Sequence, residues 1–154
     1  MRVYLASPFF SEEQVDRVER VEKALEANPT VSAYFSPRLN QLDELEFGSP
    51  EWADAVYQND VEHIHWADVV VAVLDYEGET LLHGVRHGHV DSGTAFEIGY
   101  AIAHDKPVIV VHENGGIVNL MISQSLTAYL EDAGDVGFYN FRLMPKIPYE
   151  GDVL

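Results

Sequence analysis

The chain has 154 residues, 47% of them hydrophobic, which is long enough and apolar enough for one domain with a buried core. Its 26 acidic residues against 9 basic ones give a formal net charge of −17, and this excess argues against binding to the phosphate backbone of nucleic acids. The absence of cysteine excludes disulfides, thiolate metal ligands and cysteine nucleophiles.

Targeting signals are missing from the sequence as well. No apolar run approaches the roughly 20 residues that span a bilayer. The first residues, MRVYLASPFF, lack the apolar stretch and the cleavage site of a signal peptide. We therefore expect a single domain over residues 1–154 that is cytoplasmic and has no membrane partner. The acidity by itself is compatible with simple solubility.

The first part of the chain alternates between strand and helix patterns. Residues 2–6 are a short β-type run, and apolar residues then recur at helical spacing from Ser11, which stands in capping-box register with Gln14. Residues 31–37 predict a second strand. The polar segment 38–51 that follows is long enough to be a functional loop rather than a simple connection.

The alternation continues to the end of the chain. A second helix is expected from near Pro50, and residues 68–75 are apolar on both faces, as a central parallel strand is. The Gly- and His-rich segment 76–93 reads as a loop before the next helix. Residues 106–113 form another apolar strand, and 114–130 read as a loop running into a fourth helix. This order predicts a doubly wound α/β sheet that binds ligands at the carboxyl ends of its strands.

One carboxylate stands out in the segment DSGTAFEIGYA, residues 91–101. Glu97 lies between Phe96 and Ile98, early in an otherwise apolar helix, where burial without partners costs on the order of several kcal/mol. Thr94 and Glu97 match the S/T-x-x-E capping box, so Glu97 is either a cap or a catalytic group at the ligand-binding edge. The pattern alone leaves both interpretations open.

Several short motifs together resemble one enzyme family. The motifs are VYLASPFF near the start, QND at 58–60, DSGTAFEIGYA, NLM at 119–121 and YEGDVL at the end. In this order and spacing, across most of the chain, they resemble the nucleoside 2-deoxyribosyltransferases. The resemblance implies an α/β, flavodoxin-like fold: a doubly wound parallel five-stranded sheet with helices on both faces. It also implies an enzyme that moves the 2-deoxyribosyl group of a nucleoside from one base to another through a covalent sugar-enzyme intermediate, with retention of configuration.

The resemblance assigns roles to four catalytic candidates. Glu97 is the nucleophile, Tyr4 holds its carboxylate by a hydrogen bond, Asp60 faces the nucleobase and Asp91 faces the sugar hydroxyls. Either aspartate could protonate the departing base, because a neighbouring carboxylate raises a carboxyl pKa. The residues alone allow plainer interpretations: a solvated helix residue for Asp60, a loop or cap residue for Asp91 and a half-buried strand residue for Tyr4.

The same resemblance implies the substrate-binding residues and the partners. Gln41 contacts the base through its amide, and Phe9 and Gly93 also line the substrate site. Asn119 and Met121 belong to a segment that reaches into the neighbouring subunit's site. The expected protein is therefore a homo-oligomer, a dimer or a dimer-based assembly such as a hexamer, with shared sites. Its ligands are a 2'-deoxyribonucleoside and a free base, and it uses no metal and no organic cofactor.

Two features depart from the family pattern. Segment 76–90 is longer than the expected connection, which puts the lid over the sugar and the sugar preference in question. The sequence ends in Leu154 where family members carry an aromatic residue, so a contribution of the C-terminus to the site is in doubt. The histidines of this region raise the idea of a metal site, but they alternate with glycine in a predicted loop and lack the fixed spacing of zinc ligands. They are His83, His87 and His89, preceded by His63 and His65.

Two other functions remain as alternatives at this level. The first is an N-glycosidase that hydrolyses nucleosides or nucleoside 5'-monophosphates. The loop ASPFFSEE offers two Phe and two Glu instead of a phosphate-binding nest, which favours a free 5'-hydroxyl and transfer. The second is a nucleotide-binding module without turnover on the same fold. Such a module has no need of a nucleophile at Glu97.

Overall fold

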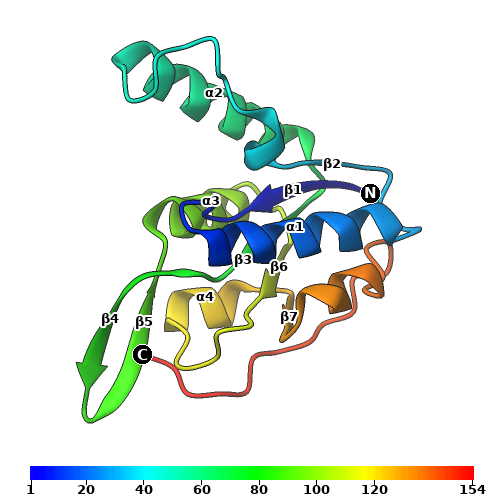
Figure 1. Cartoon of the computed structure of the whole chain (residues 1–154). Coiled ribbons are helices and arrows are strands. Elements are labelled where there is room, and N and C mark those ends of the chain that lie inside the picture. The colour runs from blue at the N-terminus through cyan, green and yellow to red at the C-terminus, as the bar shows by residue number, and fades with distance from the viewer.

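The computed structural model describes all 154 residues. Its centre is a parallel sheet of five strands, which lies between the helices (Figure 1). The strand order is β2-β1-β3-β6-β7, which is the flavodoxin-like arrangement and confirms the predicted fold class. The strands are β1 (Arg2–Ala6), β2 (Ala33–Phe35), β3 (Val69–Val73), β6 (Val108–Val111) and β7 (Ala128–Leu130). The other elements are the helices α1 (Glu12–Ala27), α2 (Pro50–Trp66), α3 (Ser92–Ala103) and α4 (Leu120–Ser125), the 3-10 turns η1 (Pro37–Asn40) and η2 (Ala133–Gly137), and the strands β4 (Tyr76–Leu82) and β5 (Val85–Val90).

The sheet has a hydrophobic core on each face because its central strands are apolar on both sides. In β1, Val3 and Leu5 face α1 and η2, whereas Tyr4 and Ala6 face α2, α3 and α4. All five residues of β3 are buried, as expected for a central parallel strand. Helices therefore cover both faces, and the loops after β1 and β3 meet at one edge of the sheet (Figure 1).

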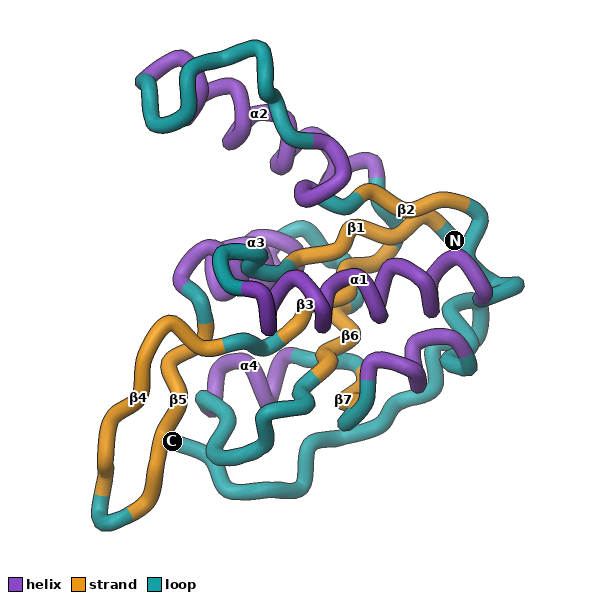
Figure 2. The backbone as a smooth tube through the Cα atoms, in the orientation of Figure 1, coloured by secondary structure: helices purple, strands orange, loops and turns teal.

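The two long helices begin where the sequence predicts. Ser11 caps α1 and forms the capping box with Gln14. Ser49 caps α2, with Pro50 at its first position. Only Ile64 of α2 is buried, near the end of the helix. Figure 2 shows the earlier part of α2, with the loop before it, standing away from the sheet. None of the helices combines the length and the apolar character that crossing a membrane requires.

Two predictions about local structure are wrong. Residues 76–90 form the antiparallel hairpin β4–β5 instead of a loop, closed by His83 and Gly84, whose φ angles are 49° and 79°. These positive angles are those of a tight two-residue hairpin turn, and the Gly and His content of the segment hides its strand character. The fourth helix ends at Ser125 rather than near 130. The short apolar run Ala128–Leu130 is the fifth strand, paired in parallel with β6, because such short runs fit a strand or a helix equally well.

Candidate active site

A cavity of about 490 Å³ lies at the carboxyl ends of β1 and β2. The chain surrounds it with the turn after β1, the segment from η1 to α2, one face of α2, and the first turns of α3. Its lining comprises Ser7, Pro8, Phe9, Phe10, Pro37, Asn40, Gln41, Leu42, Asp43, Leu45, Phe47, Trp52, Val56, Asn59, Asp60, Asp91, Gly93 and Glu97. The structure thus gathers six of the predicted residues, Phe9, Gln41, Asp60, Asp91, Gly93 and Glu97, around one space.

Tyr4 holds the Glu97 side chain in place by a hydrogen bond. The Tyr4 hydroxyl donates a hydrogen bond to Glu97 Oε2, and the tyrosine itself is fully buried in β1. Its ring stacks on Phe35 of the neighbouring strand with the centroids 5.8 Å apart. Because the buried phenol cannot turn toward solvent, it fixes the direction of the carboxylate.

Glu97 does not cap its helix. The N-cap of α3 is Asp91, whose Oδ2 accepts from the backbone N–H of Thr94 at 2.8 Å and from the Thr94 hydroxyl at 3.0 Å. Thr94 therefore lies inside the helix, and the capping interpretation of Glu97 is wrong. Asp91 is the cap that one interpretation of the sequence suggested, and it lines the cavity as well. Its Oδ1 makes no hydrogen bond within the protein and remains free for a ligand.

Burial separates the titration of two carboxyl groups in the cavity. Desolvation raises the pKa of Glu97 to about 8, with further increases from the charges of Asp60 and Asp91, while the hydrogen bond from Tyr4 opposes the shift. Desolvation also raises the pKa of Asp60 to about 6, partly offset by His63. Both carboxyls therefore change protonation state near neutral pH, which is the property that acid-base chemistry requires.

The removal of the Tyr4 hydroxyl tests this arrangement. We expect Tyr4→Phe to raise the pKa of Glu97 further and to free its carboxylate, lowering kcat by about 10- to 100-fold, the size of one lost charge-assisted hydrogen bond. Steady-state rates as a function of pH are the measurement. Tyr34→Phe, which removes a hydroxyl bonded to Glu26 on the opposite face of the sheet, is the matched control. Equal rates for both variants would show that Tyr4 has no part in the reaction.

The wider part of the cavity carries aromatic and amide groups. Phe9 stacks on Phe10 with 6.1 Å between ring centroids, and Phe47 lies against Trp52 with 4.6 Å between theirs. Gln41 is exposed and donates from Nε2 to the Arg38 carbonyl at 3.0 Å. These planar surfaces suit the flat ring of a nucleobase.

Several lining residues were not predicted as site residues. Trp52, Val56, Asn59 and Asp60 lie on neighbouring turns of α2, so the helical spacing of the sequence would have placed the first three beside Asp60. No comparable signal marks Phe47, because it reaches the cavity from the irregular segment before α2.

Asn119 and Met121 lie elsewhere. They line a second cavity of about 620 Å³ between the β4–β5 hairpin and helices α3 and α4. Asn119 caps α4 by accepting a hydrogen bond from the Met121 N–H at 2.9 Å, and the Met121 side chain is 72% exposed. Within one chain, the structure does not bring either residue to Glu97.

The histidines do not converge on one point. His83 lies at the hairpin turn, His87 and His89 lie on β5, and His63 and His65 lie on α2. No group of three or more His, Asp or Glu side chains has an arrangement that could hold a metal ion.

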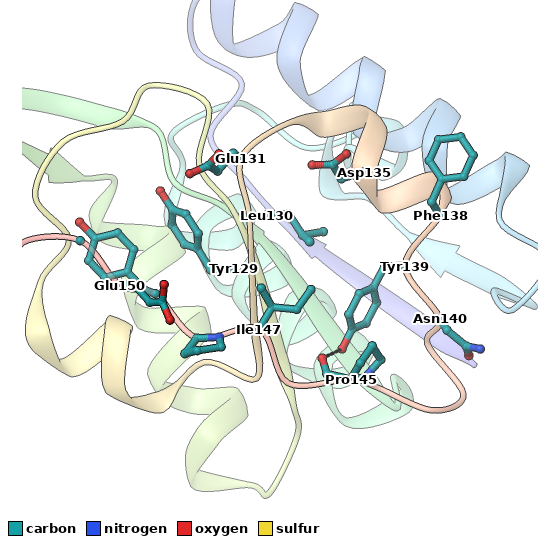
Figure 3. Close-up of a pocket in the computed structure, with 13 residues that line it drawn as sticks. Tyr129, Leu130, Glu131, Asp135, Phe138, Tyr139, Asn140, Pro145, Ile147 and Glu150 are labelled. Atoms are coloured by element: carbon teal, nitrogen blue, oxygen red, sulfur yellow. Dashed lines mark hydrogen bonds between the residues drawn. The ribbon is translucent and has the colours of Figure 1, made fainter.

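The largest cavity, about 780 Å³, is on the β7 side of the molecule (Figure 3). Tyr129, Tyr139 and Ile147 line it, and the Tyr139 hydroxyl donates to the Pro145 carbonyl at 2.8 Å. It contains neither Glu97 nor Asp60. Size therefore does not identify the site here, whereas the pair of partly buried carboxyls, Asp60 and Glu97, does.

Comparison with known proteins identifies the family of the chain. Residues 3–135 match the family model described as nucleoside 2-deoxyribosyltransferase. A nucleoside deoxyribosyltransferase of Limosilactobacillus fermentum is 32% identical over 156 residues, covering 92% of this chain and 86% of the relative. A second nucleoside deoxyribosyltransferase, from Lactobacillus leichmannii, is 28% identical, and the alignment covers 98% of this chain and 96% of the relative.

A solved structure agrees at the level of the fold. The 2-deoxyribosyltransferase of Bacillus psychrosaccharolyticus superimposes with a TM-score of 0.82 at 43% sequence identity, over 97% of this chain and 99% of that one. The chain therefore belongs to the nucleoside 2-deoxyribosyltransferase family and is an enzyme of that kind.

Proposed function

We propose that this enzyme transfers the 2-deoxyribosyl group of a 2'-deoxyribonucleoside to a second base through a covalent bond between C1' and Glu97. The observation that carries the proposal is the partly buried carboxylate of Glu97, which Tyr4 orients and which lines the cavity. The transition state at C1' resembles an oxocarbenium ion, which a carboxylate can attack. The first base leaves, the sugar ester of Glu97 forms, and a second base then displaces Glu97. Two displacements at C1' retain the β configuration.

Asp60 is the better candidate for the proton that the departing base needs. Its pKa is raised to about 6 from the ordinary 3.8, so a minor part of the group still holds its proton at pH 7. It makes no hydrogen bond within the protein, whereas Asp91 uses Oδ2 to cap α3. We assign Asp91 to the sugar hydroxyls through its free Oδ1, and Gln41, Phe9 and Gly93 to substrate binding along the cavity wall.

The charge of the cavity favours a substrate without phosphate. Its lining contains four carboxylates, Asp43, Asp60, Asp91 and Glu97, and no lysine or arginine. A nucleoside 5'-monophosphate would bring negative charge into this acidic space without a cation to receive it. We therefore place a nucleoside with a free 5'-hydroxyl in the site, rather than the 5'-phosphate that a nucleotide N-glycosidase would bind.

We further propose that the active unit contains a second copy of the chain, which supplies Asn119 and Met121. Both side chains are exposed and lie outside the Glu97 cavity of their own subunit.

Subunit mixing tests whether sites are shared. Glu97→Ala and Asn119→Ala should each be inactive or severely impaired alone. When the two variants are unfolded together and refolded at equal amounts, about one quarter of the sites should regain both native residues if subunits pair at random in twofold assemblies. The recovered activity is compared with that of each variant refolded alone. No recovery above their sum would mean that each subunit builds its site by itself.

Product analysis tests the reaction itself. We would incubate the protein with 2'-deoxyinosine, with and without adenine, and separate the products by chromatography, using Glu97→Ala as the control. The proposal predicts 2'-deoxyadenosine that requires both adenine and Glu97. Release of hypoxanthine at a rate indifferent to adenine would identify a hydrolase instead, and product formation by Glu97→Ala would remove the nucleophile from the account.

A further inference from the structure

A cluster of charged and amide side chains lies outside the cavity of the candidate site. Arg17 of α1 is only 7% exposed and forms an ion pair with the carboxylate of Asp75, the second residue after β3. Its Nε donates to Glu113 Oε1 at 3.3 Å and its Nη2 donates to Asn114 Oδ1 at 3.1 Å. Asn114 closes the ring by donating to Asp75 Oδ1 at 3.1 Å.

Asp75 connects this cluster to the site through the backbone. The carbonyl of Asp75 accepts a hydrogen bond from the N–H of Asp91 at 2.9 Å. Asp75 comes just before the β4–β5 hairpin and Asp91 just after it. This hydrogen bond therefore joins the two ends of the hairpin. Asp91 then caps α3 with Oδ2 and lines the cavity.

The base of the hairpin is fixed from its other side as well. The Tyr76 hydroxyl forms a hydrogen bond with His112 and donates to the Gly115 carbonyl at 2.6 Å. The Tyr76 ring crosses Gly88 on the opposite strand so closely that a Cβ at position 88 would overlap it. The hairpin is therefore anchored at its base, beside Asp91.

A buried ion pair is a costly way to hold a fold together. Removing Arg17 and Asp75 from water has a desolvation penalty that apolar side chains of similar volume would avoid. What the pair provides is a fixed position for the Asp75 side chain. The Arg17 guanidinium is itself held by Glu113 and Asn114, so it holds the Asp75 carboxylate in one place. Displacement of a binding group by about 1 Å costs on the order of 100-fold in activity, so direction matters at the site.

We propose that Arg17 is a positioning residue of the transferase: by fixing Asp75, it fixes the peptide that sets Asp91 at the sugar end of the cavity. The inference rests on the proposed function, in which Asp91 binds the sugar hydroxyls. It also predicts that the base end, formed by α2 and the segment before it, is independent of Arg17.

The test compares Arg17→Met with Arg20→Met. Arg20 lies one turn further along α1 and donates to Glu113 at 2.8 and 2.7 Å, but it does not contact Asp75, so it is the matched control. In Arg17→Met we expect the KM for the deoxynucleoside to rise about tenfold, the effect of one misplaced hydrogen bond, with kcat and the KM for the acceptor base changed by less than about threefold. Arg20→Met should match the wild type, and Arg17→Lys should recover part of the loss.

Backbone amide exchange reports positioning without any assay of activity. Exchange at residues 91–94 should be faster in Arg17→Met than in Arg20→Met and the wild type, because the Asp91 N–H loses a fixed acceptor. Asp75→Asn, which keeps the shape of the side chain, should show the same change and replaces Arg17→Met if that variant does not fold.

The outcomes separate this inference from the proposed function. If the wild type transfers no deoxyribosyl group, the function fails, and the exchange comparison still decides whether Arg17 holds residues 91–94. Equal exchange in the Arg17 and Arg20 variants would overturn the inference even in an active enzyme. A rise in the KM for the acceptor base equal to that for the nucleoside would also overturn it, because the effect would then not be confined to the sugar end.

Discussion

Glu97→Gln is expected to lower the rate of deoxyribosyl transfer by about 10,000-fold or more, the loss typical of a removed nucleophile. The amide keeps the shape of the side chain and still accepts the hydrogen bond from Tyr4, so the fold should be unchanged. What disappears is the negative charge that attacks C1'. Single-turnover measurements with a deoxynucleoside and excess enzyme would show the loss in the chemical step. A variant that retains more than about one hundredth of the rate would contradict the assignment.

The same substitution should stabilise the protein at alkaline pH. The folded-state pKa of Glu97 is about 8, above the ordinary value of 4.5, so the folded protein holds a proton that the unfolded chain releases. Wild-type stability therefore decreases as pH rises from about 4.5 to about 8, and this loss is absent in Glu97→Gln. Thermal unfolding at pH 5 and pH 8.5 is the check. The difference between the two midpoints should be smaller in the variant, in accord with a site that trades stability for function.

Asp60→Asn should have the second largest effect, a loss of about 100- to 10,000-fold in kcat, the range found for positioned proton donors. The loss should be greatest for bases that leave poorly without protonation. A nucleoside whose base is a good leaving group should be affected far less, and it serves as the internal control. Equal losses for both substrates would assign Asp60 to binding instead.

The pH profile gives a second test of the same pair. The pair holds two protons below about pH 6 and none above about pH 8, so a nucleophile and a proton donor coexist only while it holds one proton. With these values that proton lies mainly on Glu97, and the reactive form is the minor one that carries it on Asp60. The wild-type kcat/KM should therefore have a bell-shaped dependence on pH, with limbs near pH 6 and pH 8. The two apparent pKa values describe the titration of the pair and are not assigned to single residues. In Asp60→Asn the alkaline limb should vanish. A wild-type profile that is flat between pH 5 and pH 9 would contradict the account.

Most of the helices and strands could be predicted from the sequence, because the patterns that mark them are local in the chain. The two-sided apolar run of β3 and the capping box at Ser11 each depend on residues near one another in the chain. The fifth strand, Ala128–Leu130, was missed because three apolar residues have no period of their own. Its pairing with β6 depends on the tertiary structure, which the local sequence does not encode.

The candidate site was predicted only in part, for a related reason. Glu97 conflicts with its apolar helix, and such a local conflict can be seen in a sequence. Motif resemblance then supplied Tyr4, Asp60 and Asp91. The roles of Phe47 and of the Arg17–Asp75 pair depend on which distant segments meet, and neither spacing nor composition encodes that. The separation of Asn119 from Glu97 within one chain is what the resemblance implied, and the two residues line different cavities.

The most direct test of the covalent step is the intact mass of the protein during reaction. A 2'-deoxy-2'-fluoroarabinosyl nucleoside slows both displacements, because fluorine destabilises the oxocarbenium-like transition state. Without an acceptor base, the account predicts an adduct of one fluorinated sugar per active site, found after proteolysis on the peptide that contains Glu97. Addition of adenine should remove it and yield the β-nucleoside. An adduct on another residue, or a transfer product with inverted configuration at C1', would contradict the account.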